Sequence, residues 1–308
     1  MSETNNNFKA APIHWVILIG LSLVWGCSFL FIKRGLESFS AIQVAALRMG
    51  ISGVAFIPYI AFRLHKIDWS KWKYYLLVGL LGSALPAILF AMAQTQVNSS
   101  VSGVLNALAP LFTLVFGILL FGAPFIKPKV IGVLVGLLGA IVLMVFGQKI
   151  GESRNMWFGL FCIAGTMCYG INTNMVGKYL KGVNPIDVSA VAYVAVGIPY
   201  LFILFGTTNF VEVMQTNPQA YESLKYLGAL ALLGTVIANA LFIYLIQQTN
   251  PLFGSSVTYI MPIVSIILGA KDHESISIYH FIGMALILLG VYITNRKYNQ
   301  SAQSAANR

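Results

Sequence analysis

Four side-chain amides stand inside long apolar stretches of this 308-residue chain, which is 58% hydrophobic and 9% charged. An amide both donates and accepts hydrogen bonds, so it can bind a polar solute without carrying charge. Where water is excluded, such a group has to face protein or a hydrated cavity. We therefore expect a wet cavity that binds a small-molecule substrate. Its predicted lining residues are Trp25, Ser28, Gln94, Asn106, Tyr169, Asn172 and Asn239.

Helix packing is the competing interpretation of these polar residues. Small and hydroxyl-bearing residues allow membrane helices to approach closely, and amides hold neighbouring helices together. A single serine or threonine, taken alone, favours this interpretation. The amides fall at matching positions in two similar parts of the chain, and that recurrence favours the cavity.

Arg48 is the one charge that lies well inside a predicted membrane span. A guanidinium in the membrane is costly and is usually functional or paired. It could bind an anionic group of the substrate, pair with backbone carbonyl groups, or extend to the membrane surface. We include Arg48 among the candidate substrate-binding residues for the first of these roles. Lys33 and Arg34, which close the first span, are expected to be anchors at the membrane surface.

The residues that catalysis or metal binding would need are missing from the spans. No carboxylate lies at mid-membrane depth, which argues against a proton relay. No CxxC or HExxH pattern occurs, and the three cysteines fit small buried apolar residues. The sequence therefore predicts no catalytic set, cofactor, metal or nucleic-acid partner, and a protein that is not an enzyme. The histidines, all near span ends, are His14, His65, His273 and His280.

The elements that must position these residues are membrane-spanning helices, because about 20 mainly apolar residues cross a bilayer. Ten such runs predict an all-α polytopic membrane protein whose partner is the lipid bilayer. The runs lie near residues 13–32, 41–62, 73–94, 98–121, 129–147, 156–178, 186–206, 224–247, 252–270 and 276–295.

The distribution of Lys and Arg predicts the orientation. The termini and the loops after even-numbered spans carry 12 of these residues, and the loops after odd-numbered spans carry 6. Cytoplasmic loops are the ones rich in Lys and Arg. We therefore expect a multi-pass protein of the cell (inner) membrane with both termini in the cytoplasm. The net charge of +10 is an orientation signal of this kind.

An internal repeat divides the chain. Residues 84–117 and 236–269 are similar at a shift of 152 residues, which places Asn98 on Asn250 and Pro110 on Pro262. Each half holds five spans, and an odd number forces the second half to enter the membrane upside down. The sequence thus predicts two inverted five-helix repeats, residues 13–147 and 157–294, around a central cavity. Residues 147–156 are expected to be the loop between them.

The chain resembles the EamA family of the drug/metabolite transporter superfamily. The resemblance is carried by residues 23–29 (LVWGCSF), Arg48, residues 107–111 (ALAPL), residues 261–264 (MPIV), Gly269, Glu274, Gly283 and residues 288–290 (LLG). It implies a ten-helix fold with a central cavity and the transport of small metabolites. The first copy departs from the pattern, because Gly122 stands where the second copy has Glu274. For Glu274 we expect a contact at a helix end.

The predicted function is a secondary transporter, an exporter or facilitator, of small polar or amphipathic metabolites such as amino acids. Two alternatives remain: an integral-membrane enzyme acting on a lipid or prenyl carrier, and a channel-like or scaffold membrane protein. The pattern fits a monomer and a dimer equally. Pro110 and Pro262 are expected to bend their helices.

Overall fold

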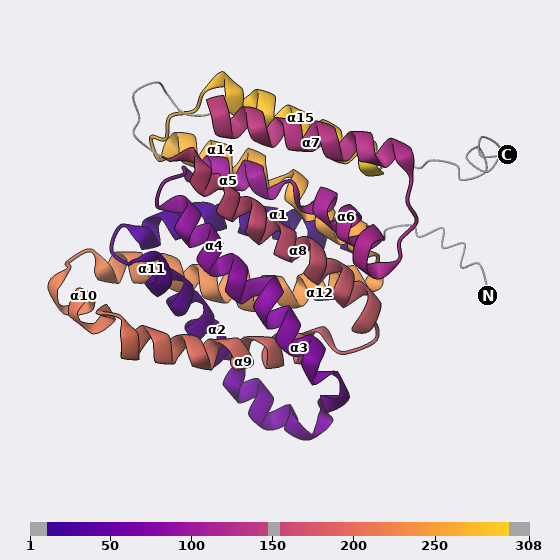
Figure 1. The fold of residues 1–308 in the computed structure, drawn as a ribbon. Coiled ribbons are helices and arrows are strands. Elements are labelled where there is room, and N and C mark those ends of the chain that lie inside the picture. Colours follow the sequence, from indigo (N-terminus) through magenta and orange to yellow (C-terminus); the bar gives the residue numbers. More distant parts are fainter. Residues whose placement is uncertain (1–10, 147–154, 296–308) are drawn as a thin grey trace.

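The computed structural model describes residues 11–146 and 155–295 (Figure 1). All regular structure in these ranges is helical, which confirms the predicted fold class. Both chain ends and nearly all of the predicted 147–156 connection, including the predicted boundary at residue 147, lie outside the described residues.

Helices occupy all ten predicted spans. Eight helical stretches have the length and composition of membrane spans, and α15 is a shorter apolar one. The spans are α1 (Pro12–Leu36), α2 (Ala41–Arg63), α3 with α4 (Trp72–Gly79, Leu85–Gln94), α5 with α6 (Ser99–Asn106, Ala109–Phe121), α7 (Lys127–Phe146), α8 (Gly159–Tyr179), α9 (Pro185–Thr207), α11 with α12 (Ala220–Ala231, Ala238–Gln248), α13 with α14 (Pro251–Ser255, Met261–Lys271) and α15 (Ile278–Asn295).

Two features of this set differ from expectation. The 21-residue helix α8 is long enough to span a membrane but is not among the eight apolar stretches, because it carries amides and threonines such as Asn172 and Thr173. A short helix, α10 (Phe210–Thr216), lies in the connection between α9 and α11, outside the ten predicted spans.

The helix starts follow local sequence rules. Ser40 caps α2, where its hydroxyl accepts from the backbone N–H of Gln43 and the Gln43 side chain accepts from the backbone N–H of Ser40. Asn184 caps α9 in the same sense, and Pro185 takes the first helical position, where a missing N–H costs nothing.

Interruptions of the helices recur at the repeat shift. A π-helical turn separates α3 from α4 at Leu80–Ala84, and another separates α11 from α12 at Leu232–Ile237. The fourth and ninth spans are each broken into two segments, whose second parts begin at Ala109 and Met261. Pro110 and Pro262 stand at the second position of these segments, so they start a new helix rather than bend a continuous one.

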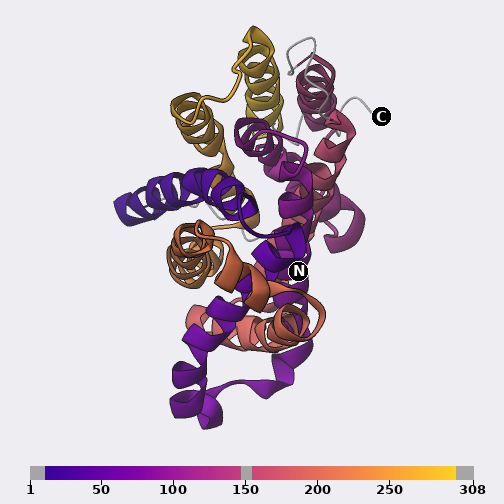
Figure 2. The ribbon, with the colours of Figure 1, turned by 90° about the vertical axis from the view of Figure 1, so that its left-hand side faces the viewer.

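Equivalent helices of the two halves pack against each other. Figure 1 shows α7 beside α15 at one edge of the molecule and α2 beside α9 toward the opposite edge, and Figure 2 gives the same arrangement from the side. Glycines permit the contact: a Cβ added at Gly53 would lie 2.9 Å from the Tyr193 carbonyl oxygen, and one at Gly197 would lie 2.6 Å from that of Met49. Most of the remaining spans lie between these two pairs, and α3 packs beside α9 at the lower edge of Figure 1.

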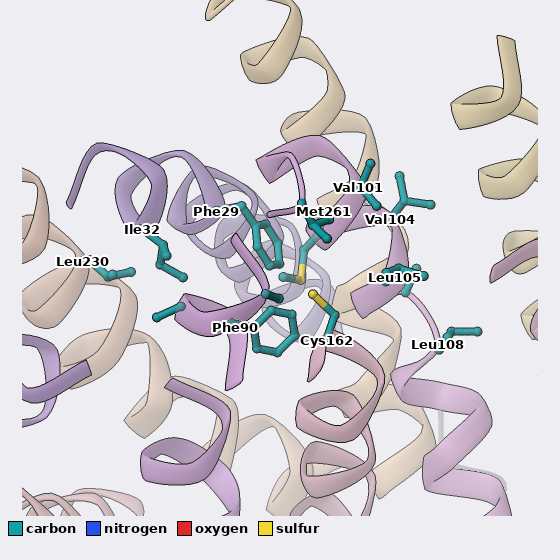
Figure 3. Packing of buried hydrophobic residues seen from close by; sticks show 14 of the residues in the cluster. Phe29, Ile32, Phe90, Val101, Val104, Leu105, Leu108, Cys162, Leu230 and Met261 are labelled. Carbon is teal, nitrogen blue, oxygen red and sulfur yellow. The ribbon is translucent and has the colours of Figure 1, made fainter. Parts of the chain in front are cut away.

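A buried apolar cluster lies where α1, α4, α5, α8 and α14 meet (Figure 3). The rings of Phe29 and Phe90 are 5.8 Å apart, and Met261 and Cys162 lie close to them. Phe29 and Phe90 also line the central cavity described next, so this cluster borders it.

Candidate functional site

A central cavity of about 80 Å³ lies between the two halves. Helices from both predicted repeats line it, as an interface between inverted halves requires. The lining residues are Trp25, Ser28, Phe29, Ile32, Arg48, Gly82, Phe90, Asn106, Ala109, Tyr169, Asn172, Thr173, Tyr193, Gly234, Asn239, Phe242, Ser255, Thr258 and Met261.

Seven of the eight predicted binding residues are brought together in this cavity. They are Trp25, Ser28, Arg48, Asn106, Tyr169, Asn172 and Asn239. Gln94 is the exception, because it lies at the end of α4 in a separate hollow with Lys33 and Glu37. The Gln94 amide is buried there, and neither of its polar atoms has a hydrogen-bond partner among the described residues.

Aromatic side chains line the cavity in two pairs that the repeat relates. Trp25 meets Phe242 edge-on, with ring centroids 5.0 Å apart. Tyr169 stacks on Phe90 at 5.9 Å. The first member of each pair comes from the first helix of one half, and its partner comes from the third span of the other half. The two halves therefore build corresponding walls.

The π-helical turns bring backbone and small residues to the cavity wall. A π turn widens the helix, and such turns are frequent at functional sites. The Trp25 indole Nε1 donates to the Gly234 carbonyl oxygen at 2.7 Å. A Cβ added at Gly234 would lie 3.0 Å from Ser28 Oγ, and one added at Gly82 would lie 2.7 Å from Asn172 Nδ2. Each turn thus leaves room for a polar side chain of the opposite half.

Arg48 is half-buried and faces the cavity. Its Nε donates to Thr235 Oγ1 at 2.9 Å, and that hydroxyl donates in turn to the Leu230 carbonyl oxygen. Tyr169 and Tyr193 line the same cavity as the guanidinium. Among the described residues, no Asp or Glu forms an ion pair with it. The positive charge is therefore oriented by neutral groups.

Two residues of this arrangement were not among the predicted binding residues. Tyr193 lies next to the position equivalent to Arg48, and its hydroxyl shares a hydrogen bond with Ser83. Thr235 is the repeat equivalent of Ser83 and holds Arg48. A hydroxyl group inside an apolar span is a pattern that could have marked Tyr193 and Thr235 as cavity residues. Sequence spacing could not show that either residue lies near Arg48.

Two of the cavity amides, those of Asn106 and Asn172, are incompletely hydrogen-bonded. Asn106 is 2% exposed and Asn172 is 3% exposed, yet the side-chain oxygen of each has no partner in the described part of the chain. Asn106 Nδ2 makes only a 3.7 Å contact with the sulfur of Met261. Since buried polar atoms are usually satisfied, two orphan acceptors at one cavity indicate a place for a ligand donor.

Charged residues join three helices at one end of the bundle, which we call the Glu274 end. Lys33 bonds to both Asp272 and Glu274, and Arg34 bonds to Asp272. Lys33 and Arg34, which were expected to be anchors at the membrane surface, thus form ion pairs between helices at this end. Glu274 accepts from the backbone N–H groups of Ser99 and Ser100, each at 3.0 Å, so it caps α5. The expected helix-end contact of Glu274 is thus confirmed.

The environment of Glu274 favours its charged form. Burial opposes ionisation, but hydrogen bonds from Ser100 and Ser99 and the charge of Lys33 outweigh it and hold the pKa of Glu274 below its ordinary value. The start of α5 adds the positive end of a helix dipole. This carboxylate therefore remains ionised under physiological conditions.

The opposite end, which we call the Asp187 end, is held differently. Arg63 Nε donates to Asp187 at 3.1 Å, and the Tyr59 hydroxyl donates to the same carboxylate at 2.6 Å. Lys178 Nζ donates to the Phe121 carbonyl oxygen at 3.4 Å. The neighbouring residue is Gly122, the repeat position of Glu274. Lys178 matches Arg34 when Tyr169 is aligned with Trp25, so it meets a neutral carbonyl where Arg34 meets the carboxylate of Asp272.

Within residues 11–146 and 155–295, no three His, Cys, Asp or Glu side chains are grouped closely enough to hold a metal ion. Cys27, Cys162 and Cys168 are free thiols. The chemistry that the cavity offers is thus hydrogen bonding, aromatic contact and one positive charge.

Comparison with known proteins gives a family match over nearly the whole chain. The model of the EamA-like transporter family matches twice, at residues 13–145 and 156–296. The uncharacterized inner membrane transporter YedA of Escherichia coli K12 is 27% identical over 285 residues, covering 91% of this chain and 90% of YedA. An uncharacterized transporter of Archaeoglobus fulgidus is 24% identical over 294 residues, covering 92% of this chain and 99% of that protein.

A solved crystal structure is similar in fold. It has a TM-score of 0.64 and 18% sequence identity, and it covers 93% of this chain and 97% of its own. At that identity the likeness supports the helix arrangement alone.

Proposed function

The chain belongs to the EamA-like transporter family, and from that premise we propose that it is a secondary transporter of small polar or amphipathic metabolites, such as amino acids. Its relatives are named as transporters, which makes the chain a multi-pass membrane protein of a transporter family. Beyond family membership, the proposal specifies the substrate class, a location in the cytoplasmic membrane, and export or facilitated diffusion as the mode of transport.

One observation carries the proposal: a cavity with buried amides lies between two halves that contribute corresponding walls. Trp25 with Phe242 and Tyr169 with Phe90 form those walls. A ligand at such an interface can be exposed to either side if one half rocks against the other. The Glu274 end and the Asp187 end would then open in turn.

Replacement of Asn172 by leucine tests the role of the cavity. Leucine has the same branching at Cγ as asparagine but no hydrogen-bonding group, so substrate binding should fail while the fold persists. We expect saturable counterflow of amino acids in liposomes to fall at least about tenfold, as loss of a buried hydrogen bond of about 1.4 kcal/mol would give. The thermal unfolding temperature of the purified variant should stay near that of the wild type.

Asn217→Leu is the matched control, since Asn217 lies in the turn between α10 and α11 and does not line the cavity. Full activity of Asn172→Leu would assign Asn172 to helix packing. Flux that does not saturate would favour a channel, and turnover of a lipid or prenyl carrier by the purified protein would favour an enzyme.

A further inference from the structure

The cavity carries a positive charge that the protein itself does not neutralise. Arg48 is the cation among its lining residues, and those residues include no Asp or Glu. A desolvated charge without a counter-charge is costly, and the cost falls when an anion pairs with it. The cavity is therefore electrostatically suited to a solute that brings a negative charge, and it disfavours cations.

The hydrogen bonds of Arg48 orient its guanidinium for a planar partner. Thr235 Oγ1 accepts a hydrogen bond from Arg48 Nε at 2.9 Å, which fixes the orientation of the guanidinium plane. The terminal nitrogens then carry the donors that match the two oxygens of a carboxylate side by side. A phosphate group, with close to two charges, would require more cations than the single arginine on this wall.

The buried amide oxygens of the cavity need a hydrogen-bond donor from the ligand, whereas Arg48 needs an acceptor. The side-chain oxygens of Asn106 and Asn172 are buried acceptors without a donor among the described residues. A ligand that carries an amine, ammonium or hydroxyl group could supply one. A solute with a carboxylate and a donor group satisfies both parts of the cavity at once.

We propose that this cavity binds small carboxylate-bearing solutes, as monoanions or zwitterions, with the carboxylate on Arg48 and a donor group on Asn106 and Asn172. This inference rests on the proposed transport function and names the chemical groups by which the cavity would select its substrates. Solutes whose carboxyl group is blocked should bind poorly, and so should small organic cations.

Matched acid and amide probes test the proposal with the purified full-length protein. The pairs are L-phenylalanine with L-phenylalaninamide, L-threonine with L-threoninamide, and L-lactate with lactamide. A ligand that binds only the folded state raises the unfolding temperature, and at a fixed concentration a tighter ligand raises it more. We expect at least one acid to raise it by about 2 °C or more at 10 mM, and its amide to raise it by less than a quarter as much.

Three variants assign the effect to Arg48. Arg48→Gln should abolish the difference between acid and amide, and Arg48→Lys should keep part of it, because a point charge lacks the planar fork. Lys225→Gln removes an equal charge from an exposed side chain and should leave the difference intact. If Arg48→Gln does not fold, Thr235→Val replaces it, since this variant keeps the charge but removes its anchor and should weaken acid binding at least threefold.

The proposal is overturned if no acid stabilises the protein, if amides stabilise it equally, or if Arg48→Gln keeps the discrimination. Its failure can be told apart from failure of the transport function. Saturable counterflow of a neutral or cationic solute would preserve the transporter and reject the carboxylate class. An acid that binds through Arg48 but is never carried across liposome membranes would preserve the site and reject the transporter.

Discussion

Two glycines set how closely the polar side chains of α1 and α8 approach the opposite half. Gly82 stands beside the Asn172 amide, and Gly234 stands beside the Ser28 hydroxyl. Both glycines belong to the π-helical turns, where the widened helix would otherwise press a side chain into the cavity. The space that lets Asn172 reach the cavity therefore comes from a residue without a side chain.

Gly82→Ala should displace the Asn172 amide. The added Cβ would lie 2.7 Å from Asn172 Nδ2, closer than Cβ contacts normally come, so the amide has to move. We expect transport to fall about threefold to tenfold, with a smaller change in the unfolding temperature, as measured by liposome counterflow and thermal unfolding. Gly228→Ala is the control, because no atom lies within 4 Å of its added Cβ. Equal activity of the two variants would contradict this role for Gly82.

For individual residues, the sequence predicted which residue types line the cavity better than it predicted which side chains they contact. Of the eight residues predicted from their polar or aromatic side chains and helical spacing, seven lie among the residues that line the cavity, because a polar face is costly in lipid. Gln94 has the same spacing but lies at the end of its helix, in a hollow separate from the cavity. Helical periodicity gives the face of a residue and not its depth relative to a cavity.

Glu274 links elements that are far apart in the sequence. It caps α5 and pairs with Lys33 of α1, while its own loop follows α14. All three helices border the cavity. One side chain thus satisfies two N–H groups at the start of a helix and compensates a cation, so its replacement should affect the whole Glu274 end.

Stability should depend on the charge of Glu274 in acid. Its pKa in the folded protein lies below the ordinary value of 4.5, so its contribution is complete above that value and is lost as the pH falls below it. We expect Glu274→Gln to lower the unfolding temperature at pH 7 by about 3 °C or more. Below pH 4.5 the difference between the variant and the wild type should shrink.

Thermal unfolding of the purified proteins between pH 7 and pH 3.5 measures this difference. Glu222→Gln is the control, since Glu222 forms only an exposed pair with Lys225 and such pairs contribute little. A difference between Glu274→Gln and the wild type that stays constant down to pH 3.5 would mean that the charge of Glu274 is not responsible.

The interruptions of the helices show where prediction from sequence was incomplete at this scale. Pro110 and Pro262 marked the broken fourth and ninth spans, because proline cannot continue the hydrogen-bond ladder. The π-helical turns at residues 80–84 and 232–237 have no proline inside them and read as continuous apolar helix. Their position follows from tertiary contacts such as that between Trp25 and Gly234, which local sequence does not encode.

The molecule as a whole combines two matching halves with two unlike ends. The repeat shift of 152 residues predicted the correspondence, and the structure extends it to the π-helical turns and to the aromatic pairs of the cavity. The difference between the ends was visible in the sequence only as Gly122 in place of Glu274. The sequence does not show that Glu274 forms an ion pair at one end of the molecule, because its partner Lys33 lies 241 residues earlier in the chain.

If the halves rock about the cavity, the charged contacts at each end should set which end is open. Removing one contact of about 1.4 kcal/mol changes the ratio of the two states about tenfold. Asp272→Asn weakens the Glu274 end, where Asp272 bonds to Lys33 and Arg34. Asp187→Asn weakens the opposite end. The two replacements should therefore act on cavity access in opposite directions.

A cysteine at the Ser28 position, in a chain whose natural cysteines are replaced, reports that access. An impermeant thiol reagent is added outside intact cells, which the predicted orientation places at the Glu274 end. We expect Asp272→Asn to raise the labelling rate at least about threefold, Asp187→Asn to lower it, and Glu222→Gln to leave it unchanged. The reverse pattern would invert the predicted orientation while keeping the rocking movement, whereas equal rates in all three variants would contradict control of access by these charges.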